Sequence, residues 1–277
     1  MSNLLKALSS RKILFDGAMG TELQKQGLRE DPAVLNLTHP EKIIGIHIQY
    51  LEAGADVITA NTFGAYSHKY SNYDHMIKAA ISHGRKALEG YPGKWLAFDL
   101  GPTGLMLEPY GDTTEDECRL IYEEAIQTGV SLGADVILIE TMMDLAELSI
   151  AVTAAKKTGL PVFATMSFDK TGRTMMGATI QDMVTLLEGL NVDALGMNCG
   201  FGPNIYASLA AELRSLTKLP IMIQPNAGLP ITGNDSSHVY YDLSVEDFAQ
   251  ATAAINADII GGCCGTSPAH IAALVKE

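Results

Sequence analysis

Apolar, β-branched runs recur along this chain, and each is followed by polar or turn residues and then by a helical pattern. Eight such runs begin near Ile13, Val57, Leu96, Val136, Val162, Ala194, Ile221 and Ile259. Successive runs lie about 35 residues apart, a length that suits one strand, one helix and two loops. The pattern therefore predicts eight consecutive strand–helix units.

The segments between the runs carry helix signals. Thr38 to Glu41 and Thr114 to Glu117 have the form of a capping box, and Ser244 to Asp247 is a weaker version. Asp144 through Lys157 is rich in Ala, Leu and Ile and is followed by a Gly and Pro stop. Near the end of the chain, Ser267 stands before a proline as a predicted N-cap. We expect a helix in each of these segments.

The strands are apolar almost throughout, which indicates a parallel sheet covered on both faces. Eight such units in about 250 residues predict a closed (β/α)8 TIM barrel. The phrases Ala53–Val57, Leu132–Val136 and Asn256–Ile259 repeat one helix-to-strand connection, so we expect residues 1–277 to form a single domain. An open doubly wound sheet is the alternative. It is disfavoured because the glycines in Asp16–Gly20 lack the dinucleotide-binding spacing.

Composition narrows the classes of function. The chain has 277 residues, 47% hydrophobic content and a net charge of −13. This acidic balance gives no basic cluster for a nucleic-acid backbone, and nucleic acid is not an expected partner. The sequence has no apolar run of about 18 residues, which a membrane span would need. It also has no long apolar region near the N-terminus, which a secretory signal would need. We therefore expect a cytoplasmic protein whose cysteines are thiols or metal ligands.

Chemistry is expected where the strands end, because the loops at that edge of a barrel form the active face. The residues at these ends are Asp16, Asn61 with Thr62, Asp99, Glu140, Ser167, Cys199, Asn226, and Cys263 with Cys264. For Asp99, Ser167 and Thr62, the simplest interpretation is a polar barrel end that meets water.

Three of the four cysteines share this position, at the ends of the sixth and eighth strands. A parallel barrel brings these ends close together. Three thiolates can bind zinc tetrahedrally and leave a fourth position open, which is typical of a catalytic zinc. The glycines on both sides of Cys263 and Cys264 would permit the bend that lets adjacent cysteines bind one ion. We predict a zinc site on Cys199, Cys263 and Cys264, whereas Cys118 is expected in the core.

A zinc ion with three thiolates carries a net negative charge and is a poor activator of water, so hydrolysis is disfavoured. It is suited to binding a fourth thiol and keeping that sulfur nucleophilic, which predicts alkylation of a substrate thiol. Asp16 and Glu140 could pair with an ammonium group. Backbone N–H groups of the turn from Gly17 to Gly20 could take a carboxylate. The expected substrate is a thiol amino acid.

Several motifs carry a family resemblance. They are Asp16-Gly17-Ala18-Met19-Gly20-Thr21, Asn61-Thr62-Phe63-Gly64, Asp99-Leu100-Gly101-Pro102, Glu140-Thr141, Asn198-Cys199-Gly200, Pro225-Asn226-Ala227-Gly228 and Gly262-Cys263-Cys264-Gly265-Thr266. Together they resemble the homocysteine S-methyltransferase family, above all the homocysteine-binding module of cobalamin-dependent methionine synthase. The resemblance covers nearly the whole chain.

This resemblance implies zinc on the three cysteines and homocysteine as the thiol. It places Asp16 and Glu140 at the amino group of homocysteine. It also places Gly17, Ala18 and Thr62 near the carboxylate. Asn226 would complete the zinc shell when substrate is absent.

The methyl donor is left open by the sequence. The multidomain synthase has folate-binding and cobalamin-binding modules, and because none follows Glu277 in this sequence, we expect either an excised or a freestanding module. The donor would then be methylcobalamin on a separate corrinoid protein or module, or a small molecule such as S-methylmethionine or betaine. Transfer to another thiol is a further alternative. A hypothesis of another class is a non-catalytic module that binds zinc and thiol amino acids.

Overall fold

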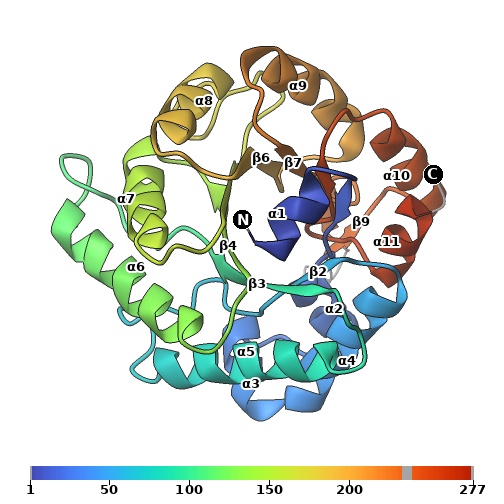
Figure 1. The fold of residues 1–277 in the computed structure, drawn as a ribbon, viewed down its shortest axis with the longest axis horizontal. Helices are drawn as coiled ribbons and strands as arrows, with labels where there is room; N and C mark the ends of the chain where they lie inside the picture. Colours follow the sequence, from blue (N-terminus) through green and yellow to red (C-terminus); the bar gives the residue numbers. More distant parts are fainter. Residues whose placement is uncertain (1, 233–238, 276–277) are drawn as a thin grey trace.

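The computed structural model describes residues 2–232 and 239–275, and Figure 1 shows helices ringing a central set of strands. The eight predicted runs form β1 (Ile13–Leu14), β2 (Val57–Thr59), β3 (Trp95–Leu100), β4 (Val136–Met142), β5 (Val162–Met166), β6 (Ala194–Asn198), β7 (Ile221–Gln224) and β10 (Ile259–Ile260). They pair in the order β1-β10-β7-β6-β5-β4-β3-β2, and every pair is parallel. A parallel bridge between Phe15 and Val57 joins the two edges. The (β/α)8 barrel is confirmed.

The outer layer consists of helices that bury one apolar face each against the strands (Figure 1). These are α4 (Pro40–Glu52), α5 (Tyr73–Leu88), α6 (Glu115–Val130), α7 (Leu145–Lys156), α8 (Ile180–Gly189), α9 (Pro203–Leu216), α10 (Val245–Ala253) and α11 (Pro268–Leu274). Two shorter helices, α2 (Met19–Lys25) and α3 (Pro32–Thr38), lie between β1 and α4. Cys118 is buried in α6, as predicted.

Most of the predicted helix starts are confirmed by their caps. Thr114 and Glu117 form the capping box of α6, and Ser244 and Asp144 accept backbone N–H groups at the starts of α10 and α7. The capping box predicted at Thr38 is wrong. Thr38 is the last residue of α3, and α4 begins at Pro40, which has no N–H to be capped and whose fixed φ suits the first helical position.

The N-terminal end of the barrel is closed by α1 (Asn3–Leu8), which Figure 1 shows at the centre of the ring. Leu4 of α1 is fully buried and packs against the residues that fill the barrel, among them Ile13, Phe15 and Phe163. The amphipathic pattern of six residues is too short for α1 to have been predicted.

The same edge of the barrel carries a repeated carboxylate contact. An aspartate stands directly before β2, β4, β6 and β10, and its side chain accepts the backbone N–H of a residue at the start of the preceding strand. The four pairs are Asp56 with Leu14 (3.0 Å), Asp135 with Leu96 (2.8 Å), Asp193 with Val162 (2.9 Å) and Asp258 with Ile221 (2.8 Å). We call these four contacts the aspartate clamps. They explain why the helix-to-strand phrase recurs in the sequence.

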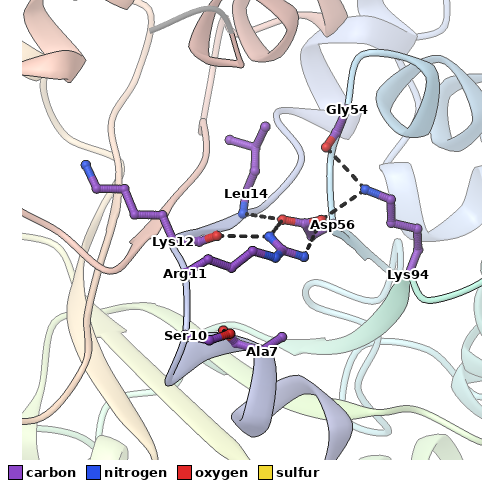
Figure 2. Close-up of polar contacts among 8 residues, drawn as sticks. All are labelled: Ala7, Ser10, Arg11, Lys12, Leu14, Gly54, Asp56 and Lys94. Carbon is purple, nitrogen blue, oxygen red and sulfur yellow. Dashed lines mark hydrogen bonds and ion pairs between the residues drawn. The ribbon is translucent and has the colours of Figure 1, made fainter.

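Each clamp is also matched by a cation. Asp135 pairs with Arg85, Asp193 with Lys156, and Asp258 with Arg214. Figure 2 shows the most buried clamp, in which Asp56 lies between Arg11 and Lys94. Arg11 donates two hydrogen bonds to the carboxylate, at 2.6 and 3.0 Å, and Lys94 donates one at 3.0 Å.

At the opposite edge, an antiparallel hairpin follows β7. It consists of β8 (Pro230–Thr232) and β9 (Val239–Tyr241), and it was not predicted. Tyr241 packs against Gly265, where an added Cβ would lie 2.2 Å from the tyrosine ring. The hairpin thus reaches the loop after β10. Among the described residues, no helix combines the length and the apolar character needed to cross a membrane.

Candidate functional site

The interior of the barrel changes from apolar to polar towards the carboxyl ends of its strands. Val57, Ala97, Leu138, Phe163 and Met222 belong to the apolar interior. Because side chains of a strand alternate between two faces, the residues two positions further along also face inward. These are Thr59, Asp99, Glu140, Thr165 and Gln224. In β6, Asn198 stands four residues after the interior residue Ala194 and pairs in register with Gln224. A polar chamber therefore lies directly above an apolar core.

Cys199, Cys263 and Cys264 come together at this chamber. Their sulfur atoms all lie within 4.8 Å of one another, although the residues come from two strand ends far apart in sequence. Three sulfurs around a tetrahedral zinc, each about 2.3 Å from the ion, would be about 3.8 Å apart. The donor type, number and spacing fit zinc. The predicted convergence of the three cysteines is present.

The backbone turns sharply where β6 ends. Cys199 and Gly200 have φ values of 62° and 68°, a left-handed conformation that is unfavourable for a cysteine. The surroundings hold it there, because the Cys199 N–H donates to the Gln224 carbonyl at 3.0 Å and the Tyr206 hydroxyl donates to the Cys199 carbonyl at 2.5 Å. The strained turn directs the sulfur towards the other two cysteines.

Different constraints hold Cys263 and Cys264. Gly265 has a φ of 82°, which confirms the predicted bend after the pair. Gly262 is required by space, since an added Cβ would lie 2.4 Å from Thr266 Oγ1. The segment after β7 supports the pair, because the Cys263 N–H donates to the Pro225 carbonyl at 2.8 Å.

Hydrogen bonds within the cluster distinguish the three thiols. Cys263 and Cys264 donate to Cys199, and these bonds are the main reason that the pKa of Cys199 lies far below its ordinary value. The same bonds raise the pKa of Cys263 and of Cys264. The Tyr241 hydroxyl and the Asn226 side chain add hydrogen bonds to Cys264 and Cys199. A divalent cation bound by the three sulfurs would displace their protons.

Asn226 is almost completely buried beside this cluster. Its side-chain oxygen has no hydrogen-bond partner among the described residues. A buried, unsatisfied acceptor calls for an explanation, and an oxygen ligand for a metal is one. The contact between Asn226 and zinc stays a prediction.

Asp16 and Glu140 are two of the carboxyl groups in the chamber. Asp16 accepts two hydrogen bonds of 2.7 Å from the backbone N–H and the hydroxyl of Thr59. Burial raises the pKa of Asp16 to about 7, although the Thr59 bonds oppose the shift. Burial, the Cys199 thiolate and Asp16 raise the pKa of Glu140 to about 8. Neither group forms an ion pair among residues 2–232 and 239–275, and a cationic ligand would stabilise their charged forms.

Asn198 links the acids to the cysteines, a role that the sequence interpretation missed. Its Nδ2 donates to Glu140 at 3.0 Å and to the Thr141 hydroxyl at 2.7 Å, and it lies 3.9 Å from Cys263 Sγ. Its Oδ1 accepts from the Thr165 hydroxyl at 2.7 Å. The inward-facing period of β6 could have identified Asn198.

The residues predicted at the substrate carboxylate lie at the start of α2 and after β2. An added Cβ on Gly17 would lie 2.5 Å from Thr266 Oγ1, so no side chain fits there. The Ala18 N–H donates to the same hydroxyl at 3.2 Å. The Thr62 hydroxyl donates to the Asp99 carbonyl at 2.7 Å and is buried. Their contact with a carboxylate stays a prediction.

Comparisons with known proteins point to one family. The family model described as homocysteine S-methyltransferase matches residues 13–277. The chain is 35% identical over 301 aligned positions to methionine synthase of Mycobacterium tuberculosis and 33% identical to that of Mycobacterium leprae. The alignments cover 98% of this chain but 25% and 24% of these relatives. The chain thus spans about a quarter of the length of the curated relatives that it matches.

Solved structures give the same result. The apo form of the homocysteine methyltransferase MmuM from Escherichia coli has a TM-score of 0.78 and 25% identity, with 99% of each chain covered. The metallated form of MmuM has a TM-score of 0.83 at 24% identity and covers 100% of both chains, a likeness of fold.

Proposed function

The chain belongs to the homocysteine S-methyltransferase family, and we propose that it acts as a single zinc-dependent barrel that methylates the thiol of homocysteine to give methionine. The observation that carries this proposal is the meeting, in one chamber, of three cysteine sulfurs with two carboxyl groups, those of Asp16 and Glu140, that form no ion pair among the described residues. Such a chamber is complementary to a molecule that has a thiol at one end and an ammonium group at the other.

Cys199, Cys263 and Cys264 would hold the zinc ion. Zinc in this setting would supply the substrate sulfur as a thiolate at neutral pH. The chain's own residues keep the three sulfurs in place through the strained turn at Cys199 and the hydrogen bonds from Asn226 and Tyr241. The open side of the cluster is left for the substrate.

Asp16 and Glu140 would fix the other end of homocysteine. Their carboxylates would accept N–H groups of the ammonium group, while Gly17 and Ala18, with Thr62, would lie near the carboxylate of the substrate. The Asn198 side chain donates a hydrogen bond to Glu140 and so helps to hold it in place. Fixing both ends of the substrate would aim its sulfur at the incoming methyl carbon.

The reaction balances as a displacement at carbon. A sulfur electron pair forms the new bond to the methyl carbon, and the bond from that carbon to the donor breaks with its electrons leaving on the donor. The thiol proton is released to solvent. No oxidant or reductant is needed, and the product is a thioether that carries no thiolate charge.

We propose that the methyl group comes from a corrinoid on a separate protein or module, so that methylcobalamin serves indirectly. Exposed apolar side chains on loops after β2, β3, β5 and β7 support a protein-borne donor, because exposed apolar patches mark docking surfaces. They are Phe63, Met106, Tyr110, Met175 and Leu229, of which Tyr110 and Met175 are 77% and 84% exposed.

A donor assay tests this function. Zinc-loaded protein is incubated with homocysteine and, in parallel, with methylcobalamin, S-methylmethionine or betaine, and methionine is measured. We expect methionine with methylcobalamin. A reaction only with a small donor would overturn the corrinoid proposal, and homocysteine binding without turnover for any donor would indicate a binding module.

Metal analysis tests the zinc cluster. The unaltered protein is expected to hold one zinc per chain, whereas Cys199→Ala should lose most of its metal and at least about 10³-fold in activity. Cys118→Ala is the matched control, because Cys118 is a cysteine outside the cluster. This variant should keep its zinc and its activity. Zinc far below one per chain in the unaltered protein would contradict the proposal.

A further inference from the structure

A third carboxyl group, that of Asp99 on β3, lies in the chamber and has no part in the function proposed above. Ala97, two residues earlier on β3, belongs to the apolar interior of the barrel. The Asp99 side chain therefore points inward as well. Only 4% of Asp99 is exposed. The sequence interpretation, in which Asp99 is a polar barrel end that meets water, is wrong because the structure buries it.

The local structure holds Asp99 firmly. The Thr62 hydroxyl donates to the Asp99 carbonyl at 2.7 Å and accepts the Asp99 N–H at 3.2 Å. The carboxylate accepts the backbone N–H of Leu100, but its Oδ1 atom is buried and has no partner among the described residues. Leaving a buried acceptor unsatisfied costs about 1–3 kcal/mol. The fold therefore presents a fixed, free oxygen to the chamber.

The charges around Asp99 are of one sign. Glu140 and Asp16 are close enough to act on its carboxyl group electrostatically. None of the ion pairs found among residues 2–232 and 239–275 involves any of these three acids. Three carboxyl groups in one chamber, with Asp16 and Asp99 buried and Glu140 partly buried, form a site for a cation, since a buried charge requires a partner.

We propose that Asp99 is a third carboxylate of the homocysteine subsite and accepts one N–H of the substrate ammonium group through Oδ1. This inference rests on the proposed function. An ammonium group has three N–H donors, and Asp16, Glu140 and Asp99 supply one carboxylate for each. The three acids together select thiols that carry a free primary ammonium group and reject thiols without one.

The substrate without its amino group provides the test. Homocysteine and 4-mercaptobutanoate differ only by that group, so their dissociation constants from zinc-loaded protein, measured calorimetrically, isolate its contribution. We expect the unaltered protein to bind homocysteine at least about 100-fold more tightly, because a site built for hydrogen bonds rejects an analogue that lacks them. Asp99→Asn should weaken homocysteine binding about tenfold and change binding of the analogue less than twofold.

Stability separates this role from a structural one. Asp99→Asn removes a buried carboxyl group that has no cation among the described residues, so we expect a midpoint of urea unfolding equal to or above that of the unaltered protein. A structural role predicts a lower midpoint and equal losses for both thiols. If the Asp99→Asn protein does not fold, Asp99→Ser serves as the second variant. Equal losses for both thiols, or no loss for homocysteine, would overturn the inference.

The same measurements separate this inference from the proposed function. If neither thiol binds to the unaltered zinc-loaded protein, the proposed function fails. If homocysteine binds strongly and Asp99→Asn keeps the same preference over 4-mercaptobutanoate, the role of Asp99 alone fails. Asp169→Asn, a change of an exposed aspartate on the loop after β5, is the control and should alter neither constant.

Discussion

Asp56 and Asp16 are aspartates at opposite ends of the same barrel, and they are 7% and 3% exposed. Burial raises the pKa of both. At Asp56, hydrogen bonds from Arg11, the Leu14 N–H and Lys94 outweigh that effect, and the pKa lies below its ordinary value. At Asp16, two bonds from Thr59 do not outweigh it, and the pKa rises to about 7.

This difference shows at which end of the barrel the buried carboxylates already have cationic partners. The four aspartate clamps find their cations within the chain, so their charges contribute to folding. The acids of the chamber find none among the described residues, and an ammonium group of the substrate would supply the missing charge. Functional sites often retain features that reduce the stability of the free protein. Replacing a carboxylate should therefore have opposite effects at the two ends.

The largest effect is expected at the clamp shown in Figure 2. Asp56→Ala leaves Arg11 and Lys94 without their partner and the Leu14 N–H unsatisfied. Because the pair is partly buried, we expect a loss of about 2–4 kcal/mol in the free energy of unfolding, measured by urea titration. Binding of zinc and of homocysteine at low temperature should be unchanged.

Asp258→Ala is the matched control for this clamp. Its side chain is 43% exposed, against 10% for Asp56. Water screens the exposed pair, so the loss should be smaller than that at Asp56. Equal losses at the two positions would contradict the view that burial decides the strength of a clamp.

The next effect is expected at Asp16 and has the opposite sign. The pKa of Asp16 is about 7 in the folded protein and about 3.9 when unfolded, so folding retains a proton between these values. Its contribution to stability is complete below pH 4 and is lost as the pH rises towards 7. Asp16→Asn should remove this loss and stabilise the substrate-free protein by about 1–2 kcal/mol at pH 8.

Urea titrations at pH 5 and pH 8 measure this change in slope. The same variant should bind homocysteine at least about tenfold more weakly, since the ammonium group loses a partner. A variant that is less stable than the unaltered protein at pH 8 would contradict the comparison between the two ends.

The smallest effect is expected at Tyr241, which joins the hairpin to the cluster. Tyr241→Phe removes the hydroxyl that hydrogen-bonds Cys264 and leaves the ring on Gly265. Losing one such bond, worth about 1 kcal/mol, should weaken zinc binding about fivefold in competition with a chelator. Tyr240→Phe, at the exposed neighbouring residue, is the control and should bind zinc normally.

Local patterns predicted most of the fold. Each strand is an apolar run, and the caps at Thr114, Asp144 and Ser244 depend on residues at most three positions apart. The prediction at Thr38 failed because two helices meet there, and the proline after His39 sets the boundary. The three cysteines could be placed together because strand order alone determines which ends share a rim.

The parts of the site that the sequence did not reveal depend on long-range packing. Tyr241 reaches Cys264 only because a hairpin folds back over the barrel end. Asn198 was noted only as the neighbour of Cys199, and its contacts lie on β4 and β5. Whether Asp99 meets water or a ligand depends on the walls of the chamber. Residues from several strands form these walls, so the sequence of one strand does not reveal them.

The aspartate clamps also determine where the cysteine sulfur atoms lie along the barrel axis. Asp193 stands six residues before Cys199, and Asp258 stands five residues before Cys263, on strands that are neighbours of β7. A slip of either strand by one residue would break its clamp and would also shift a sulfur by about 3.3 Å, more than a zinc–sulfur bond length. Correct register of these strands at the amino-terminal edge of the barrel is thus also required for zinc binding at the carboxyl-terminal edge.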